Sequence, residues 1–571
     1  MDRRVRWFRA AGVVFLGAGL TLGASSAYAE KLPVFKLKAP KVDKVKARDL
    51  FSRGLGATPT EQEGPNVVSY KSGRKVLEVD KRSGLAFMGD MEKLWNPKAR
   101  ANVPDQAKAK ELSDKFLNDN RLLPDQAEQK MRVVFSHHSE TGMGTDAPGQ
   151  VNRQILDRQV NYRTEITIKD AAGGERAIPV YGGGGKLKVA IGDQGRVVGF
   201  SGGFREIDRV EAEEEILPKA GAEAEFKKQL GNTQVKNVQS RLAYFAAPAF
   251  EEQSVLAPVW VVSGELQVGR DTVPSREVVI PATKYGPKLE PGPPAKARGQ
   301  QEPPPAANPD EGKQSSWFDF RQLLDLLATP LYAQSGFECG TEWIGPSQGL
   351  GGSPGNKQGF IDQCIAAGWS VIFDWGEASA WESDWRANDD AYVDNADLVF
   401  YTGHASQSGW VLNPPADTFL HHTEVNVATI DQWGDTDVEW IVIAACGPHQ
   451  STHFTTNTTN AFDRWRGVFD GLHVMLGYGA VTYDNTSEGR RFMELSRAGW
   501  NVVDAWFRTA WEIQPSSNGY GPPNGPTIFA TAMYAHNGDH CARYEHLWGM
   551  GTTCADVVGA TQQRYLLWSG T

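Results

Sequence analysis

Two segments in the C-terminal half of the chain end in side chains that can do chemistry. ADLVFYTGH, residues 396–404, ends in His404, and VEWIVIAACG, residues 438–447, carries Cys446, 42 residues after that histidine. A thiol with an ordinary pKa of about 8.5 is mostly protonated at neutral pH, so it becomes a nucleophile only when a base accepts its proton. An imidazole beside Cys446 would be such a base. The two segments therefore predict nucleophilic catalysis by a cysteine and a histidine.

The elements that must position this pair are strands. In both segments apolar residues follow one another without alternation, which is typical of strands buried on both faces. SVIFDW, LHVMLGYG and TIFATAMYA are further runs of this kind, and helical patterns occur near residues 358–367, 460–469 and 490–513. This alternation predicts a mostly parallel α/β sheet flanked by helices. Side chains that follow the carboxyl ends of such strands converge on one crevice, so His404 and Cys446 meet if their strands are neighbours.

At these residues the sequence resembles the caspase-like clan of cysteine peptidases, which includes caspases, gingipains, legumain and separase. The clan has an apolar strand ending in His-Gly and a later one ending in Ala-Cys, and these positions hold His404-Ala405 and Ala445-Cys446 here. The resemblance spans residues 340–535. It implies hydrolysis of a protein or peptide substrate without a cofactor or metal. Cys446 would be the nucleophile, His404 the base and then the acid, and the backbone N–H groups of Cys446 and Ala405 the oxyanion site.

An acidic stretch, residues 374–397, is the candidate for further contacts. It holds eight carboxylates and a single basic residue, Arg386. Asp389 and Asp390, together with Trp410, are the candidate substrate-binding residues, and the carboxylates would suit an arginine or lysine side chain. Two alternatives stay open: several carboxylate oxygens can bind a structural calcium ion, and a run of this kind can also be a solvated loop.

The five cysteines all follow residue 338. Cys541 and Cys554 lie 13 residues apart, and Cys339 and Cys364 lie 25 apart, so each pair can close a modest disulfide loop in an oxidising compartment. This pairing leaves Cys446 as the free thiol. It is one of the fifteen ways in which five cysteines can form two pairs.

The first 29 residues are typical of a Sec signal peptide, because arginines precede a short apolar run that ends in Ala-Tyr-Ala. We therefore expect a secreted, periplasmic or extracellular protein. No stretch reaches the roughly 20 apolar residues that a membrane span requires.

Residues 335–571 carry 10 basic against 27 acidic residues, a formal charge of −17, whereas residues 1–334 carry 49 against 42, or +7. This asymmetry has two explanations: long-range attraction between the two parts, or an acidic surface that serves solubility alone. The diffuse basic excess disfavours nucleic acid as a partner.

A proline-rich linker divides the chain. Residues 286–334 are poor in apolar residues until an amphipathic helical pattern begins at Trp317, which separates residues 30–285 from residues 335–571. The front part shows hairpin patterns around Ser83-Gly84 and Asp193-Gln194-Gly195 and helical patterns near 104–120 and 211–229, so it is predicted to be α+β.

Residues 60–285 resemble PepSY and thermolysin-propeptide domains, with Pro258-Val259-Trp260 in a later strand. In that family the domain inhibits or chaperones an exported peptidase. The resemblance therefore implies a zymogen with an intramolecular propeptide.

Other chemistries fit the sequence less well. The chain contains no H-E-x-x-H and no C-x-x-C, which disfavours a zinc hydrolase. A serine hydrolase is also disfavoured, because none of the predicted strands of the C-terminal half runs into a G-x-S-x-G elbow. The rival hypothesis is a catalytically inactive caspase-like exported protein that binds a peptide or glycan in an aromatic-rich groove. The observation behind this hypothesis is that 14 of the 18 tryptophans follow residue 335, where they could line such a groove.

Overall fold

The structure is a computed structural model, and it describes most of the chain. The described residues are 30–99, 102–125, 130–146, 153–169, 173–289, 292–298, 336–413, 417–425, 432–538, 540–558 and 563–571. The predicted signal peptide and the predicted amphipathic helix after residue 316 lie outside these ranges.

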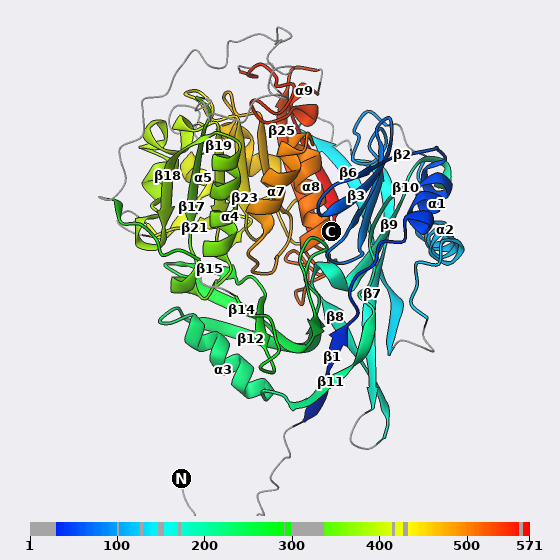
Figure 1. Cartoon of the computed structure of the whole chain (residues 1–571). Coiled ribbons are helices and arrows are strands. Elements are labelled where there is room, and N and C mark those ends of the chain that lie inside the picture. Colours follow the sequence, from blue (N-terminus) through cyan, green and yellow to red (C-terminus); the bar gives the residue numbers. More distant parts are fainter. Residues whose placement is uncertain are drawn as a thin grey trace, which may run out of the picture.

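Strands dominate the N-terminal part of the chain (Figure 1). Its strands are β1 (Lys31–Leu37), β2 (Thr60–Glu63), β3 (Val67–Ser72), β4 (Lys75–Asp80), β5 (Ala86–Asp90), β6 (Met131–Thr145), β7 (Gln154–Lys169), β8 (Glu175–Tyr181), β9 (Lys186–Ile191), β10 (Val197–Gly202), β11 (Ile207–Glu215), β12 (Val235–Phe245), β13 (Val255–Leu256), β14 (Pro258–Val268), β15 (Asp271–Pro274) and β16 (Val278–Pro281). Its helices are α1 (Lys44–Leu55), α2 (Gln106–Asp119) and α3 (Lys219–Gln229).

The two predicted hairpins are confirmed, since β4 pairs with β5 and β9 pairs with β10, both antiparallel. The helix expected near 211–229 begins only at Lys219. Residues before it form β11, which pairs antiparallel with β1, and Pro218 then occupies the N-cap of α3.

The C-terminal part contains a mixed sheet with a parallel core. Strands β17 (Glu338–Trp343), β18 (Ser370–Gly376), β19 (Leu398–Thr402), β23 (Trp440–Ala444) and β24 (Val474–Tyr478) are parallel, in the order β18-β17-β19-β23-β24. The predicted strand TIFATAMYA forms β25 (Phe529–His536), but it runs antiparallel, as does β26 (Gln563–Gly570). Every residue of β19 and of β23 is buried, which explains their uninterrupted apolar sequences.

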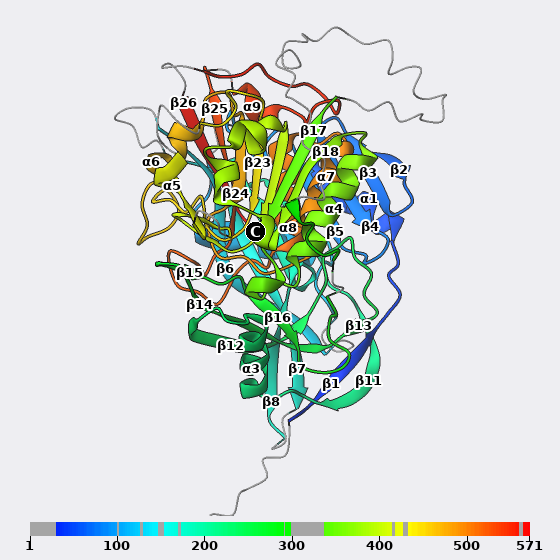
Figure 2. The ribbon, with the colours of Figure 1, turned by 90° about the vertical axis from the view of Figure 1, so that its left-hand side faces the viewer.

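Helices and loops cover the two faces of this sheet differently (Figure 2). Helices α4 (Ser353–Ala366), α7 (Glu488–Arg497) and α8 (Val502–Ile513) pack on one face. The other face carries an aromatic core under α5 (His422–Val425), α6 (Ala461–Trp465) and a small sheet of β20 (Ala405–Ser406), β21 (Gly409–Val411) and β22 (Phe419–His421). The remaining α-helix of the described ranges is α9 (Cys541–Tyr544), and several short 3-10 helices lie in the connections. Within the described ranges, no helix is both long and apolar enough to span a bilayer.

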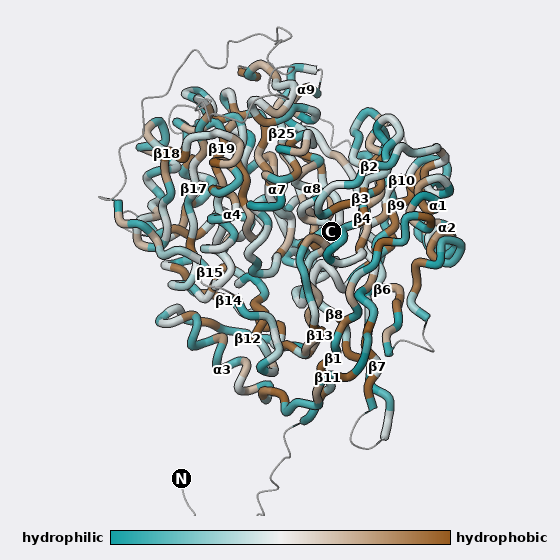
Figure 3. Tube along the Cα trace, in the orientation of Figure 1, coloured by the Kyte–Doolittle hydropathy of each residue, from teal (hydrophilic) through white to brown (hydrophobic). Residues whose placement is uncertain are grey.

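One sheet joins the two parts of the chain. Strand β26 pairs with β6 from Tyr565↔Thr145 to Ser569↔Thr141, so the described strands form one mixed sheet of 20 strands besides two small antiparallel sheets. Outside the C-terminal part, the described parallel pairing is a two-residue contact between β8 and β12. Hydrophobic residues follow this sheet through both parts (Figure 3). An ion pair of 2.6 Å between Arg508 of α8 and Glu78 of β4 adds a second link. Residues 30–285, here called the front region, are therefore part of the same continuous sheet as the C-terminal part.

Candidate active site

Two adjacent strands place His404 and Cys446 at the same edge of the sheet. Strands β19 and β23 are parallel neighbours, and their last residues, Thr402 and Ala444, are paired in register. His404 and Cys446 each follow two residues later. The strand order changes direction between β17 and β19, and ligands of open α/β sheets bind beyond the carboxyl ends of strands at such a point. In the described part of the chain, no hydrogen bond joins the imidazole to the thiol directly.

The hydrogen bonds of His404 fix its tautomer. Its Nε2 lies 3.0 Å from the carbonyl oxygen of Gln348, and its Nδ1 accepts a hydrogen bond of 3.2 Å from the backbone N–H of Arg276. A carbonyl oxygen can only accept, so Nε2 carries the proton and Nδ1 presents its lone pair. Burial lowers the pKa of His404 to about 4. The ring is therefore neutral at pH 7, and its basic nitrogen is occupied by Arg276.

Cys446 is a free, fully buried thiol. Its Sγ lies 3.8 Å from Oγ1 of Thr482. Burial raises the pKa of Cys446 to about 11, although the charge of Arg276 opposes the increase. Gly447 has a φ of 70°, a left-handed conformation that glycine adopts without strain, and this lets the chain turn directly after the thiol. At pH 7 the thiol of Cys446 is protonated and the imidazole of His404 is neutral. The two side chains therefore lack the thiolate and imidazolium charges that would make the cysteine reactive.

The N–H group of Ala405 is not used in the small sheet that Ala405 begins. Ala405 begins β20 and lies opposite Trp410 of β21, and the N–H of Val411 donates to the carbonyl oxygen of His404. Hydrogen-bonded and non-hydrogen-bonded pairs alternate in an antiparallel ladder, so Ala405 and Trp410 form a non-hydrogen-bonded pair. The N–H of Ala405 therefore points away from β21, and its use by another group does not disturb the ladder.

Arg276 is the central residue that sequence reasoning missed. It is fully buried, and it contacts residues next to both reactive groups: its backbone donates to His404, and its guanidinium donates to Thr402 and to the carbonyl oxygen of Ala444. The only signal was that two charged residues, Arg276 and Glu277, stand directly before the apolar run of the segment SREVVIPAT. Gln348 and Thr482 gave no comparable signal, since one acts through its carbonyl and the other through a common hydroxyl.

The acidic stretch runs between the two edges of the sheet: Asp374 and Glu377 lie at the carboxyl end of β18, whereas Asp390 and Asp394 lie toward the edge opposite to His404 and Cys446. That Asp389 and Asp390 bind substrate stays a prediction. Asp390 accepts a hydrogen bond from Thr436, and Asp394 accepts one from the N–H of Val438. These residues precede β19 and β23, whereas the reactive pair follows them. A five-residue strand, about 17 Å long, separates the two edges.

Trp410 also does not line a groove. It is fully buried, with its ring centroid 4.9 Å from that of Trp385 and 5.4 Å from that of Trp465. It packs as a core residue, and its contact with a substrate stays a prediction. The aromatic-rich region packs under β20, β21 and α6 and does not form an open binding surface there.

Carboxylate oxygens of Asp390, Asp394 and Asp435 lie within 4.8 Å of one another, as do those of Glu338, Asp397 and Asp437. These are oxygen donors, which suit a hard cation such as calcium. Asp394, however, already accepts backbone N–H groups from Gly434, Thr436 and Val438, so its oxygens are held by the protein.

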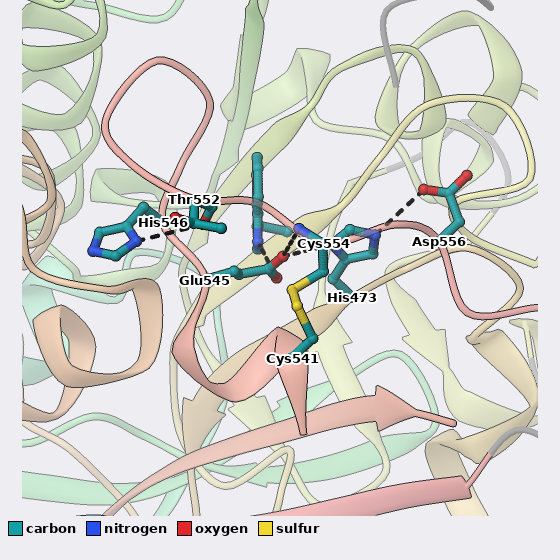
Figure 4. The surroundings of a disulfide bond; sticks show 8 residues. His473, Cys541, Glu545, His546, Thr552, Cys554 and Asp556 are labelled. Carbon is teal, nitrogen blue, oxygen red and sulfur yellow. Dashed lines mark hydrogen bonds and ion pairs between the residues drawn. A yellow bond between two sulfur atoms is a disulfide. The ribbon is translucent and has the colours of Figure 1, made fainter. Parts of the chain in front are cut away.

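One of the two predicted disulfides is confirmed: Cys541 and Cys554 are bonded (Figure 4). Beside it, Glu545 accepts from the N–H of Cys554 and lies 2.9 Å from Nδ1 of His473. Burial alone would lower the pKa of His473, but Glu545 and Asp556 outweigh it and raise the value to about 10. A buried ion pair therefore supports this loop.

The second predicted disulfide is absent. Cys339 of β17 and Cys364 of α4 are free and fully buried. Their thiols interact in the apolar core between the strand and the helix, and burial raises the pKa of Cys339 well above its usual value. A protonated thiol packs there as a small apolar group, so the core is complete without a bond.

Comparison with known proteins gives a family without an assigned activity. Residues 341–570 match the family described as "Domain of unknown function (DUF6345)". A solved structure of an uncharacterized protein from Eubacterium rectale is 12% identical, with 45% of this chain and 84% of that chain covered and a TM-score of 0.26. No curated protein matches the chain. His404 and Cys446 lie inside the region of the family match, whereas Arg276 lies outside it.

Proposed function

We propose that this protein is an exported cysteine-peptidase-like hydrolase, held in a latent state, with Cys446 as the nucleophile and His404 as the general base. The observation that carries the proposal is the pairing of Thr402 with Ala444, because it brings the ends of two separate strands, and hence imidazole and thiol, to one edge of the sheet. The caspase-like sequence pattern at these strand ends supports the same assignment.

The proposed reaction uses groups of this chain alone. Once Arg276 leaves, His404 Nδ1 accepts the proton of the Cys446 thiol, and the sulfur attacks the carbonyl carbon of a peptide bond. Backbone N–H groups near Cys446 and Ala405 stabilise the resulting oxyanion. The C–N bond then breaks as His404 returns the proton to the leaving amine nitrogen. Water, deprotonated by His404, attacks the thioester, which releases a carboxylate and restores the thiol.

Gln348 acts as a positioning residue in this scheme. Its carbonyl oxygen holds the Nε2 proton of His404 at 3.0 Å, which orients the ring and leaves Nδ1 for the thiol. When His404 becomes an imidazolium ion, the same hydrogen bond becomes charge-assisted and therefore stronger. The scheme consequently needs no third carboxylate.

Latency follows from the position of Arg276. Its N–H occupies the basic nitrogen of His404, and Cys446 is fully buried in this state. The segment belongs to the front region, which fits the resemblance of that region to inhibitory propeptides. Strand β26 is paired with β6 of the same front region, so activation requires a local displacement of residues 275–277.

The test is hydrolysis of a peptide library by three forms of the full chain. We expect the Arg276→Ala protein to cleave peptides much faster than the unmodified protein, and Arg276→Ala/Cys446→Ala to be inactive. Arg276→Ala/Cys339→Ala is the matched control, since it removes another buried free thiol and should still cleave. Cleavage that survives the loss of Cys446, or a folded Arg276→Ala protein that cleaves nothing, would reject the proposal in favour of a non-catalytic binding protein.

A further inference from the structure

A bulge in the front region carries Arg276 into the candidate active site. Strands β15 and β16 both pair with β14, from Glu265↔Pro274 on one side and from Val262↔Val278 on the other. Three residues, 275–277, therefore lie opposite two, Ser263 and Gly264. One extra residue in a strand forms a β-bulge, which turns a side chain away from its regular position. Here the bulge directs a charged side chain into the C-terminal part of the protein.

The guanidinium of Arg276 enters a pocket with acceptors for both terminal nitrogens, whereas its buried Nε has no hydrogen-bond partner among the described residues. One terminal nitrogen donates to Oγ1 of Thr402 at 3.2 Å and to the carbonyl oxygen of Ala444 at 2.9 Å. The other donates to the carbonyl oxygen of Tyr483 at 2.7 Å and to a carboxylate oxygen of Glu488 at 3.2 Å. All four terminal hydrogens thus have acceptors. The arrangement suits a planar fork of donors, which arginine has and lysine lacks.

The pocket supplies the negative charge that this cation requires. Glu488 is fully buried, and its carboxylate accepts from the hydroxyl of Tyr478 at 2.6 Å, from the amide of Gln514 at 2.6 Å and from that of Asn356 at 3.2 Å. These bonds hold it in place independently of Arg276. A buried carboxylate is strongly unfavourable without a partner cation, so the pocket is electrostatically incomplete when empty.

The backbone around Arg276 lies as an extended peptide lies in a binding site. Glu277 donates to the carbonyl oxygen of Thr482 at 3.0 Å and accepts from the N–H of Asp484 at 2.9 Å, so it adds to this loop as a strand. Such pairing is a common way of holding a peptide. Thr482 is also the residue whose hydroxyl is 3.8 Å from the Cys446 sulfur. Side-chain pocket, strand-like pairing and reactive thiol therefore meet around one residue.

We infer that the pocket formed by Thr402, Ala444, Tyr483 and Glu488 is a specificity pocket for the arginine side chain of a peptide substrate, and that Arg276 is its internal occupant. The inference rests on the proposed function. Glu488 is the specificity-determining residue, because it is the carboxylate that contacts the guanidinium. Substrates are peptides with arginine beside the bond that is cleaved.

Ligand binding tests the pocket without catalysis. In the Arg276→Ala/Cys446→Ala protein we expect calorimetry to detect binding of Nα-acetyl-arginine methylamide, with the lysine analogue about tenfold to a hundredfold weaker. Arg276→Met/Glu488→Gln/Cys446→Ala, which lacks both charges, should not bind the arginine compound. If the Arg276→Ala/Cys446→Ala protein does not fold without a ligand, the yield of refolded protein in the presence of each compound is measured instead. Equal effects of the two compounds, or no effect of either, would overturn the inference.

Hydrolysis separates this inference from the proposed function. With Cys446 intact, the Arg276→Ala protein should hydrolyse peptidyl-arginine aminocoumarins in preference to lysine, asparagine and aspartate analogues. Adding Glu488→Gln should reduce the arginine-to-lysine ratio of kcat/KM by about tenfold or more. Selective binding without hydrolysis would leave the pocket standing and refute the enzyme. Hydrolysis without a preference for arginine would support the enzyme and refute the specificity pocket.

Discussion

The reactivity of Cys446 toward an alkylating reagent should depend on Arg276 and on pH in a defined way. In the closed structure the pKa of the thiol is about 11. At pH 7 about one molecule in ten thousand would then carry a thiolate, against about 3% for a thiol of pKa 8.5, a deficit of roughly 300-fold. Complete burial of the sulfur reduces access further. The unmodified protein should therefore be almost inert to iodoacetamide at Cys446.

Removing Arg276 should invert this behaviour. In the Arg276→Ala protein, residues 275–277 lose the side-chain hydrogen bonds that anchor them. We expect this segment to move away, which takes the backbone N–H of residue 276, retained by alanine, off Nδ1 of His404 and lets water reach the sulfur. An imidazolium and thiolate pair stays reactive at pH 6, where an unassisted thiol is only about 0.3% ionised. Alkylation rates measured by peptide mapping from pH 5 to pH 9 should thus show reactivity well below pH 7.

Two internal comparisons make the assay decisive. Cys339 is equally buried and free, so it reports general opening of the structure. His404→Gln in the Arg276→Ala background should abolish the reactivity at pH 6 and leave only reaction above pH 8. If Cys446 in the Arg276→Ala protein reacts no faster than Cys339, or follows the titration of a simple thiol, the proposed activation by His404 is incorrect.

Three further predictions follow from burial and connectivity. The folded state favours neutral His404, with a pKa of about 4, so its contribution to stability is complete above pH 6.5 and is lost as the pH falls toward 4. The pKa of His404 in the folded state is about 2.5 below the ordinary value, which corresponds to about 3 kcal/mol of stability. His404→Gln should therefore flatten the fall in the free energy of unfolding, measured with denaturant, between pH 7 and pH 4.5. An unchanged slope would contradict this. Cutting the proline-rich linker should leave two fragments that co-elute in gel filtration, because β26 pairs with β6 and Arg508 with Glu78; separate elution without denaturant would refute it. Non-reducing peptide maps should contain a Cys541–Cys554 bond with Cys339, Cys364 and Cys446 as free thiols, and a Cys339–Cys364 bond would show that the buried thiols oxidise on export.

The strands were the most predictable part of the fold, for a local reason. Uninterrupted apolar runs such as those of β19 and β23 reflect burial on both faces, and this information lies within five residues. The direction of β25 was not predictable in the same way, since a buried strand has the same composition whether it runs parallel or antiparallel. The pairing of β26 with β6 joins residues more than 400 positions apart, and no periodicity reports it.

The site was predictable where the chain order alone decides its geometry. His404 and Cys446 follow their strands, so strand direction places them at the carboxyl edge. The same reasoning does not decide the place of Asp389 and Asp390, because they lie within the connection that runs from the carboxyl end of β18 to the amino end of β19. Arg276 could not be placed from sequence, since its position depends on a bulge in one part of the chain meeting a pocket in another.

The continuous sheet has a consequence for how inhibition can be relieved. A detached inhibitor is lost on dilution, whereas a segment anchored by strand pairing on the same folded body keeps a fixed effective concentration, on the order of millimolar for short tethers, at any protein concentration. Dilution therefore cannot activate this protein. A substrate must instead outcompete the segment directly, so activity would rise with the local abundance of well-fitting peptides and stay low in their absence.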